Sequence, residues 1–277
     1  MHNRNRAEGW QHAKNTGHSN EELCAILLKE NLEVQMRFLN CLGLKNEKVK
    51  EVKTGALHEH GVPSILGDKT KAKPDLHVTL SSGKIIGISL KKSLSGQVFL
   101  ISVDRFIQGF EAAYEEVPDI VKQGIKLFWG GHPDIISIAN KINGKHKDYE
   151  LRKKRLVHAT IAKYNPDIDN ALIKWFRDNV TKIFEFCFTK GLASDANDWA
   201  HIIWYKNMVD PDVCVDTFFT LDSIQSKIST EEIVYGTKNG GSTIQLPFGF
   251  VQWHDPGNKG NHNLQFHHKY KKLIKLL

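Results

Sequence analysis

The sequence predicts an α/β fold in which helices flank a β-sheet. Residues 71–93 alternate apolar and polar side chains with a period of two, as in a β-hairpin. Residues 18–44 and 167–188 instead repeat apolar side chains at helical spacing. The 277 residues suffice for one sizeable core. We therefore expect a single domain over residues 1–277, with its core in about 15–130 and a second region of helices and a C-terminal hairpin in about 131–277.

The first helix is expected over residues 18–44. Ser19 can cap it, and Glu22 follows three residues later as in a capping box. Gly43 is a suitable end. The apolar stripe of this helix consists of Leu23, Ile26, Leu27, Val34 and Phe38.

The remaining helices and strands are predicted from the same two patterns, alternation every second residue for strands and helical spacing for helices. A basic, turn-rich connection over residues 45–73 includes a short strand and leads into the hairpin. Further along we expect a helix over 103–117, strands over 124–134, 199–207 and 213–221, and a second hairpin within 240–272. The loop of that second hairpin is rich in glycine and asparagine.

The composition indicates what kind of partner the protein binds and in which compartment it works. The net charge of +7 and the pI near 9.1 favour a polyanionic partner. The four cysteines are scattered without a CxxC pair, which argues against a zinc site or a disulfide framework and for a reducing compartment. The polar N-terminus has no secretory signal, and no apolar run reaches the ~20 residues of a membrane span. We expect a cytoplasmic protein.

Alternation within residues 75–91 also fixes a register for the first hairpin. A loop of three residues, with Gly83 at positive φ, sets Leu76 opposite Ile88 and Val78 opposite Ile86. The same register brings three polar side chains together at the open end of the hairpin, namely Asp75, Ser89 and Lys91.

This polar group suggests a metal-dependent phosphodiesterase. Mg²⁺ needs few protein oxygens, so the Asp75 carboxylate, a backbone carbonyl such as that of Leu90 and a substrate phosphate can suffice. Lys91 would lie beside the ion and offset charge or position water. The alternative is structural: an aspartate before a strand is commonly a turn residue, and lysines commonly close an edge strand. The spacing alone leaves both open.

The segment "PD", thirteen residues and then "SLK" resembles the PD-(D/E)XK nuclease signature, with Ser89 in the place of the usual acidic ligand. More widely the chain is similar to the small type II restriction endonucleases that cut GCGC and, more distantly, CCGG, whose members carry an amide residue there. The similar segments, in order, are "SNEEL", "LGLKNEKVKEVKTG", "KPDLHV", "ISLKKS", "FWGG", "RKKRL…IKWF" and "FGFVQW…GNKGNHNLQF", with an insertion at "HEHGVPSILGDKT".

The resemblance implies a restriction-endonuclease-like fold, a mixed central β-sheet flanked by helices, and Mg²⁺-dependent hydrolysis of double-stranded DNA at a short specific sequence. Asp75 would be the central metal ligand and Lys91 the active-site lysine, with Ser89 at the variable position. Glu21 would be the helix-borne carboxylate that reaches the metal, although Glu22 is the alternative. A homodimer on a palindromic site is the expected assembly.

DNA contacts are expected from two groups of residues. Phosphates would be bound by Lys69, Lys71, Lys73, Lys92 and the basic stretch 145–155. Bases would be read by Gln97, in the loop after the site, and by Gln252, His254, Asn258, Lys259, Asn261, His262, Asn263 and Gln265. The alternatives are a solvated helical face and an ordinary polar hairpin loop. His267, His268 and Lys269 are expected to form a basic patch.

Two other functions fit the same residues. One keeps the fold and the chemistry but acts on branched, nicked or damaged DNA, as a phage or repair nuclease. The other is a DNA-binding protein on a degenerate nuclease scaffold, in which Ser89 marks the loss of catalysis.

Overall fold

The structure, a computed structural model, describes residues 20–54, 61–142, 154–209, 212, 214–228, 233–255, 260 and 262–277. The chain forms two compact units, each taken here by itself. The first unit comprises Met1–Pro63, Lys69–Ser93 and Ala193–Leu221, and the second comprises Ser64–Asp68, Leu94–Leu192 and Asp222–Leu277. Residues 193–221, which the sequence places in the second region, thus belong to the first unit.

The first unit is built on a five-stranded mixed sheet with the order β1-β4-β5-β7-β8. Its strands are β1 (Val49–Thr54), β4 (Leu76–Leu80), β5 (Ile85–Lys91), β7 (Ile202–Lys206) and β8 (Asp216–Thr220). Only β5 and β7 pair in parallel. The predicted mixed central sheet is confirmed, as are the strands expected over 199–207 and 213–221, and β5 is its central strand.

The β4–β5 hairpin has the predicted register. Leu76 pairs with Ile88 and Val78 pairs with Ile86. The loop closes with a hydrogen bond from the Leu80 amide to the Lys84 carbonyl at 2.9 Å, and Gly83 has φ +88° as the turn requires. Local alternation and one glycine were therefore sufficient to specify this pairing.

The predicted first helix is wrong in one respect, because it is two helical segments. Residues 20–30 are helical, and α2 (Leu32–Cys41) begins anew at Asn31. The Asn31 side chain accepts hydrogen bonds from the amides of Glu33 and Val34 at 3.0 and 3.2 Å, as an N-cap does. The break changes the buried face of the first segment: Leu23 and Ile26 are about half exposed, at 51% and 50%, whereas Leu28 is fully buried. Ser19 lies outside the described residues.

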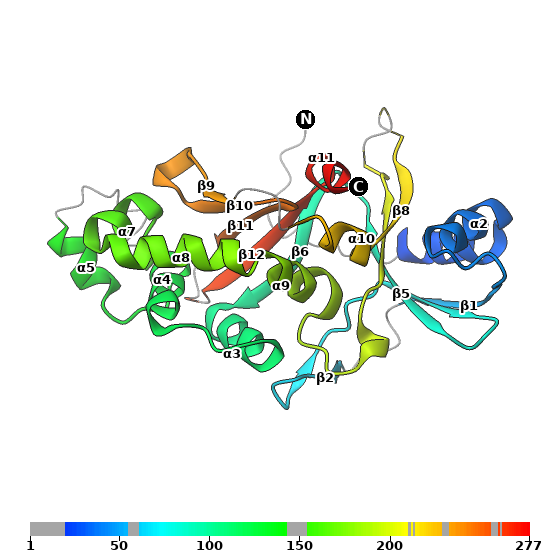
Figure 1. Ribbon diagram of the computed structural model, residues 1–277, viewed down its shortest axis with the longest axis horizontal. Coiled ribbons are helices and arrows are strands. Elements are labelled where there is room, and N and C mark those ends of the chain that lie inside the picture. The colour runs from blue at the N-terminus through cyan, green and yellow to red at the C-terminus, as the bar shows by residue number, and fades with distance from the viewer. Residues whose placement is uncertain are drawn as a thin grey trace. The chain divides into compact units, whose positions relative to one another are not determined.

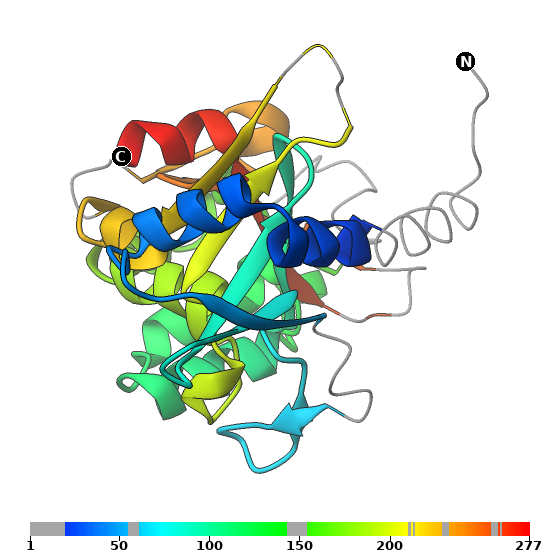
Figure 2. The same ribbon diagram turned by 90° about the vertical axis from the view of Figure 1, so that its right-hand side faces the viewer.

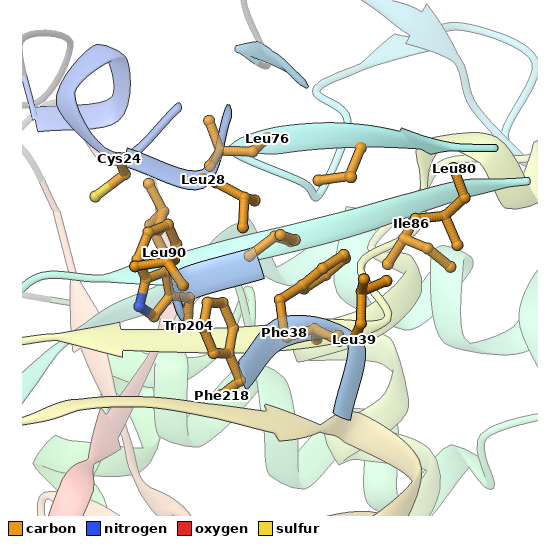
Figure 3. Packing of buried hydrophobic residues seen from close by; sticks show 14 residues of the cluster. Cys24, Leu28, Phe38, Leu39, Leu76, Leu80, Ile86, Leu90, Trp204 and Phe218 are labelled. Atoms are coloured by element: carbon orange, nitrogen blue, oxygen red, sulfur yellow. The ribbon is translucent and has the colours of Figure 1, made fainter. Parts of the chain in front are cut away.

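These two segments cover one face of the sheet (Figure 2). Figure 3 shows their side chains, among them Leu28 and Phe38, directed at the strands. Phe38 meets the Phe218 ring edge-on at 5.8 Å, and Phe218 stacks on Trp204 at 4.8 Å. The apolar stripe of the hairpin, Leu76 to Leu90, is buried against this cluster. The polar stripe that holds Asp75, Ser89 and Lys91 consequently faces the other side of the sheet.

Truncation of this cluster is expected to destabilise the fold strongly. Phe38→Ala should lower the free energy of unfolding by about 3–5 kcal/mol, because the fully buried ring leaves a cavity. Met36, on the same helix but 58% exposed, provides the control: Met36→Ala should change it by less than about 0.5 kcal/mol. Urea denaturation of both variants measures the difference, and equal losses would contradict the assignment of this core.

The second unit contains an antiparallel sheet with the order β6-β12-β11-β10-β9. Its strands are β6 (Ser95–Ser102), β9 (Val234–Tyr235), β10 (Thr243–Leu246), β11 (Gly249–His254) and β12 (Asn263–Lys269). Figure 1 shows β10, β11 and β12 side by side. The predicted C-terminal hairpin is confirmed by β11 and β12. The loop predicted around Gln97 is wrong, because Gln97 lies within β6.

The helices of this unit are α3 (Val103–Ala113), α4 (Asp119–Trp129), α5 (Ile135–Lys141), α7 (His158–Tyr164), α8 (Pro166–Asp178) and α9 (Val180–Phe184), with a π-helix over Glu185–Lys190. The helix expected over 103–117 is confirmed in α3, whereas the single helix expected over 167–188 is divided at Asn179 and continues as α9 and the π-helix. The strand predicted over 124–134 is wrong: residues 119–129 form α4 and bury Val121, Ile125 and Phe128, a helical spacing that a short apolar window does not reveal.

Short elements complete the description: β2 (Val62–Pro63) and β3 (Lys69–Thr70), which pair with each other, the α-helical turns α10 (Leu221–Gln225) and α11 (Tyr270–Leu273), and the 3₁₀ turns Ala196–Asp198, Lys238–Gly240 and Ile274–Leu276. None of the helices in the described part of the chain combines the length and apolar character that crossing a bilayer requires.

One face of the second unit's sheet is buried and the other is open. Strand β12 alternates between half-buried and buried side chains along most of its length. Phe266 on the buried face contacts Phe106 of α3, with ring centroids 5.7 Å apart. Gln265 and the residues two positions before and after it on β12 lie on the opposite, open face.

Candidate active site

Asp75 is fixed at the open end of the β4–β5 hairpin by both its main chain and its side chain. Its amide donates to the Ile88 carbonyl at 2.8 Å. Its carboxylate oxygen Oδ2 accepts the Leu90 amide at 2.6 Å and the Ser89 hydroxyl at 3.3 Å. The carboxylate therefore takes the place of a main-chain acceptor for β5 just before the start of β4. These hydrogen bonds hold the side chain in one orientation, unlike that of an exposed turn residue.

Lys91 joins the same group. Its ammonium Nζ donates to the Ser89 hydroxyl at 2.6 Å and to the Leu90 carbonyl at 3.4 Å. Ser89 thus connects the lysine to the carboxylate, and the predicted convergence of Asp75, Ser89 and Lys91 is what the structure contains. The sheet order excludes the alternative for Lys91, because β5 lies between β4 and β7 and is not an edge strand.

Burial gives Lys91 unusual electrostatics. Only 9% of the residue is exposed, and β7 pairs with β5 on its far side, with Tyr205 opposite Lys91. Burial lowers the pKa of Lys91 below its ordinary value of 10.5, the negative charge of Asp75 acts in the opposite direction, and the positive charge of Lys92 lowers it further. The amine is therefore closer to its neutral form than a surface lysine, as is common for lysines that work as bases.

The oxygen donors at this site fit Mg²⁺. Asp75 uses Oδ2 for its two hydrogen bonds, whereas Oδ1 has no hydrogen-bond partner within the described residues. The Leu90 carbonyl is the second hard oxygen beside Lys91. Mg²⁺ commonly takes one or two protein oxygens and keeps several waters. In the described ranges no group of three or more His, Cys, Asp or Glu side chains surrounds a metal position.

Glu21, the predicted carboxylate of the first helix, forms an ion pair with Lys92. Its Oε1 lies 3.3 Å from the Lys92 ammonium, and the two side chains are 21% and 23% exposed. Glu22 is exposed, so of the two candidates Glu21 is the one in a structured environment. Nearby Cys24 is fully buried, and burial raises the pKa of its thiol to about 11. The raised pKa favours the protonated thiol, which is consistent with the place of Cys24 in the hydrophobic core.

The lysines expected to bind phosphate lie in varied settings. Lys69 and Lys71 are exposed, and Lys73 is half-buried, with its main-chain amide bonded to the Asp198 carbonyl at 3.0 Å. Lys92 is already paired with Glu21. In the basic stretch 145–155, residues 145–153 lie outside the described residues, whereas Arg155 is 2% exposed and hydrogen-bonds the Phe128 carbonyl, so it is part of the core and not of a solvated face.

Three of the predicted base-reading residues form a row across the open face of the second unit's sheet. Gln252 on β11 donates to Gln265 on β12 at 2.8 Å, and Gln265 donates to Gln97 on β6 at 2.7 Å. Asn263 donates to the main-chain oxygen of His254 at 3.2 Å, directly across the same strand pair. Asn258, Lys259 and Asn261 lie outside the described residues.

The predicted basic patch at 267–269 is wrong, because alternation divides it. His268 is 2% exposed and belongs to the buried face. His267 lies on the open face, where burial and the nearby charges of His254 and Lys269 lower its pKa, so it favours the neutral form. Its ring stacks on Phe250 at 4.5 Å. Phe250 is not one of the base-reading residues predicted above. It lies two residues before Gln252 on β11, so the alternation of that strand already placed it on the same face.

No protein-family model and no curated protein sequence matches the chain. Among solved structures, the chain is similar to the restriction endonuclease MspI in complex with its cognate DNA, with a TM-score of 0.48 and 12% sequence identity over 85% of this chain and 77% of that chain.

Proposed function

We propose that this protein is a Mg²⁺-dependent endonuclease that hydrolyses phosphodiester bonds of double-stranded DNA at a short specific sequence, as type II restriction endonucleases do. The observation that supports this most is the hydrogen-bonded group of Asp75, Ser89 and Lys91 at the end of a central strand. A buried lysine beside an oriented carboxylate costs stability, and such costs are typical of functional sites.

In this proposal Asp75 and the Leu90 carbonyl hold the metal, and Glu21 is a further candidate ligand. When bound, Mg²⁺ stabilises negative charge on the scissile phosphate and lowers the pKa of a coordinated water. The Leu90 amide and the Ser89 hydroxyl keep the Asp75 carboxylate in one orientation, with Oδ1 directed away from its own hydrogen bonds.

Lys91 has two tasks in the same proposal. As an ammonium it would place positive charge next to the phosphate; in its neutral form, which the lowered pKa favours, it would instead accept a proton from the attacking water. Ser89 holds the amine at 2.6 Å, so its hydroxyl positions Lys91 and does not itself react. The in-line attack of water on phosphorus would leave a 5′-phosphate and a 3′-hydroxyl.

DNA recognition is assigned to the open face of the second unit's sheet. The amides of Gln97, Gln252 and Gln265 carry the paired donors and acceptors that distinguish base edges in the major groove. Lys73 and Lys92 in the first unit are the proposed phosphate contacts. A palindromic site bound by a homodimer is part of the proposal, by analogy with the resembling enzymes.

A digest of DNA of known sequence tests this function. With Mg²⁺, plasmid DNA should give discrete, reproducible fragments whose mapped ends share one short sequence, and chelation of the metal should stop the reaction. Smearing, nicking alone or a preference for junctions would instead select the nuclease for branched or damaged DNA.

A second candidate is a DNA-binding protein without catalysis. Ser89 favours it, because the hydroxyl stands where an acidic metal ligand is usual and leaves Asp75 as the one carboxylate of the triad. Salt-sensitive binding of duplex DNA with no cleavage in either Mg²⁺ or Mn²⁺ would select this candidate.

A further inference from the structure

A pocket of about 570 Å³ lies at the β9–β10 side of the second unit's open sheet face. Residues that line it include Tyr235, Lys238, Gln245, Phe250, Gln252 and Lys269. All of these belong to the second unit. The pocket therefore combines aromatic rings, amides and lysines.

The aromatic rings of the pocket are held in place from behind. Phe250 stacks on His267, with centroids 4.5 Å apart and ring planes 4° from parallel. Tyr235 stacks on His158 at 4.0 Å, and its hydroxyl donates to the Asp169 carbonyl at 3.1 Å. Phe250 is half-buried, and besides His267 its ring is approached by the exposed, flexible Lys269 side chain, which a stacking ligand would have to displace. Rigid aromatic surfaces of this kind are the usual stacking partners of nucleobases.

The polar groups complete a site for a base that carries a phosphate. Gln252 uses its Nε2 for the bonds to Gln265 and His267, so its carbonyl oxygen can accept from a ligand. Gln245 donates to the hydroxyl of Thr243, two residues earlier on the same strand β10, at 3.2 Å. Lys269 is exposed with its ammonium 5.2 Å from the Phe250 ring centroid, and Lys238 is exposed as well. Both cations suit a phosphate bound next to a stacked base.

We propose that this pocket binds a nucleobase that has left the base stack of the DNA. A paired base presents only its edge to a protein, whereas stacking on Phe250 needs its face, so the occupant must be unpaired. The row of Gln97, Gln265 and Gln252 ends at this pocket, which places edge reading and face stacking on one continuous surface. This inference rests on the proposed function, because it assumes a DNA substrate.

The test uses two duplexes that are identical except for one unpaired 2-aminopurine in the second. In metal-free buffer, the protein should bind the bulged duplex about 10-fold more tightly than the paired one, as expected for one stacked base. Phe250→Ala should remove this preference without changing affinity for the paired duplex. Phe250→Trp keeps a stacking surface and should retain both the preference and the change in 2-aminopurine fluorescence.

A second variant tests the pocket without removing an aromatic side chain, in case Phe250→Ala disturbs the fold. Gln245→Leu preserves volume and should weaken the preference about 3- to 10-fold, with thermal unfolding unchanged. Equal affinity of the wild type for both duplexes, or a preference that survives Phe250→Ala, would overturn the pocket. Binding of deoxyguanosine monophosphate that Phe250→Ala abolishes, without a preference for the bulge, would assign it to a free nucleotide and overturn the extruded base. Failure of the assumed DNA substrate is distinct, because neither duplex would then bind, and loss of cleavage in Mg²⁺ with the preference for the bulge retained would overturn the nuclease and not the pocket.

Discussion

Asp75→Asn should reduce DNA cleavage by about 10³-fold or more while duplex binding remains measurable. Asparagine has the same shape, and its carbonyl oxygen can still accept the Leu90 amide that Asp75 accepts at 2.6 Å. What disappears is the negative charge that would hold the metal beside Lys91. Initial cleavage rates at saturating Mg²⁺, together with binding measured in its absence, separate these two effects.

The matched control is another acidic residue of the same sheet. Glu51 on β1 has a side chain that is 48% exposed and forms an ion pair with Lys53. Glu51→Gln removes one negative charge as well, but away from the site, and should leave the cleavage rate within about twofold. Full activity of Asp75→Asn would refute the metal assignment, and equal losses in both variants would attribute the effect to net charge.

Lys91→Met should lose cleavage to a similar extent and yet gain stability. The ammonium is buried, and its burial outweighs the attraction of Asp75, as the lowered pKa shows. Methionine has a similar length and fills the same space without a charge to desolvate. We expect the free energy of unfolding at pH 7 to rise by about 1 kcal/mol, since the lowered pKa shows that the folded protein disfavours the charged lysine, whose ammonium bonds Ser89 and not the Asp75 carboxylate directly.

The pH dependence of this gain has a definite sign. Below the lowered pKa of Lys91, the folded protein carries an ammonium in a site that disfavours it. Between that pKa and the ordinary value of 10.5, the unfolded chain binds the proton and the folded protein does not, so the stability of the wild type rises with pH. The advantage of Lys91→Met should therefore shrink as pH increases through this window.

Urea denaturation of both proteins between pH 7 and pH 10 measures the window, with Lys53→Met as the control. Lys53 is on β1 with its side chain 46% exposed, and its replacement should change stability little at any pH. An Lys91→Met variant that is less stable than the wild type at pH 7 would show that the lysine is a structural partner of Asp75 and not a group kept for chemistry.

Three features of the fold could not be predicted correctly from the sequence. The Asn31 cap was visible in the sequence as an asparagine two residues before Glu33, but the continuous apolar pattern on either side favoured one helix. The strand predicted over 124–134 was wrong because a short run of apolar residues does not distinguish the spacing of a helix from that of a strand. The buried state of Arg155 was also hidden, because a basic stretch usually lies on a solvated surface.

The hairpin of residues 75–91, its register and the convergence of Asp75, Ser89 and Lys91 could be predicted from the amino-acid sequence. These depend on a two-residue period and one glycine turn, which are properties of neighbouring residues. Three further contacts could not be predicted: the pairing of β7 with β5 beside the buried Lys91, the ion pair of Glu21 with Lys92, and the row of three glutamines from three strands. Those contacts join segments far apart in the chain, and their existence depends on how the sheets are ordered, which no local pattern of side chains encodes.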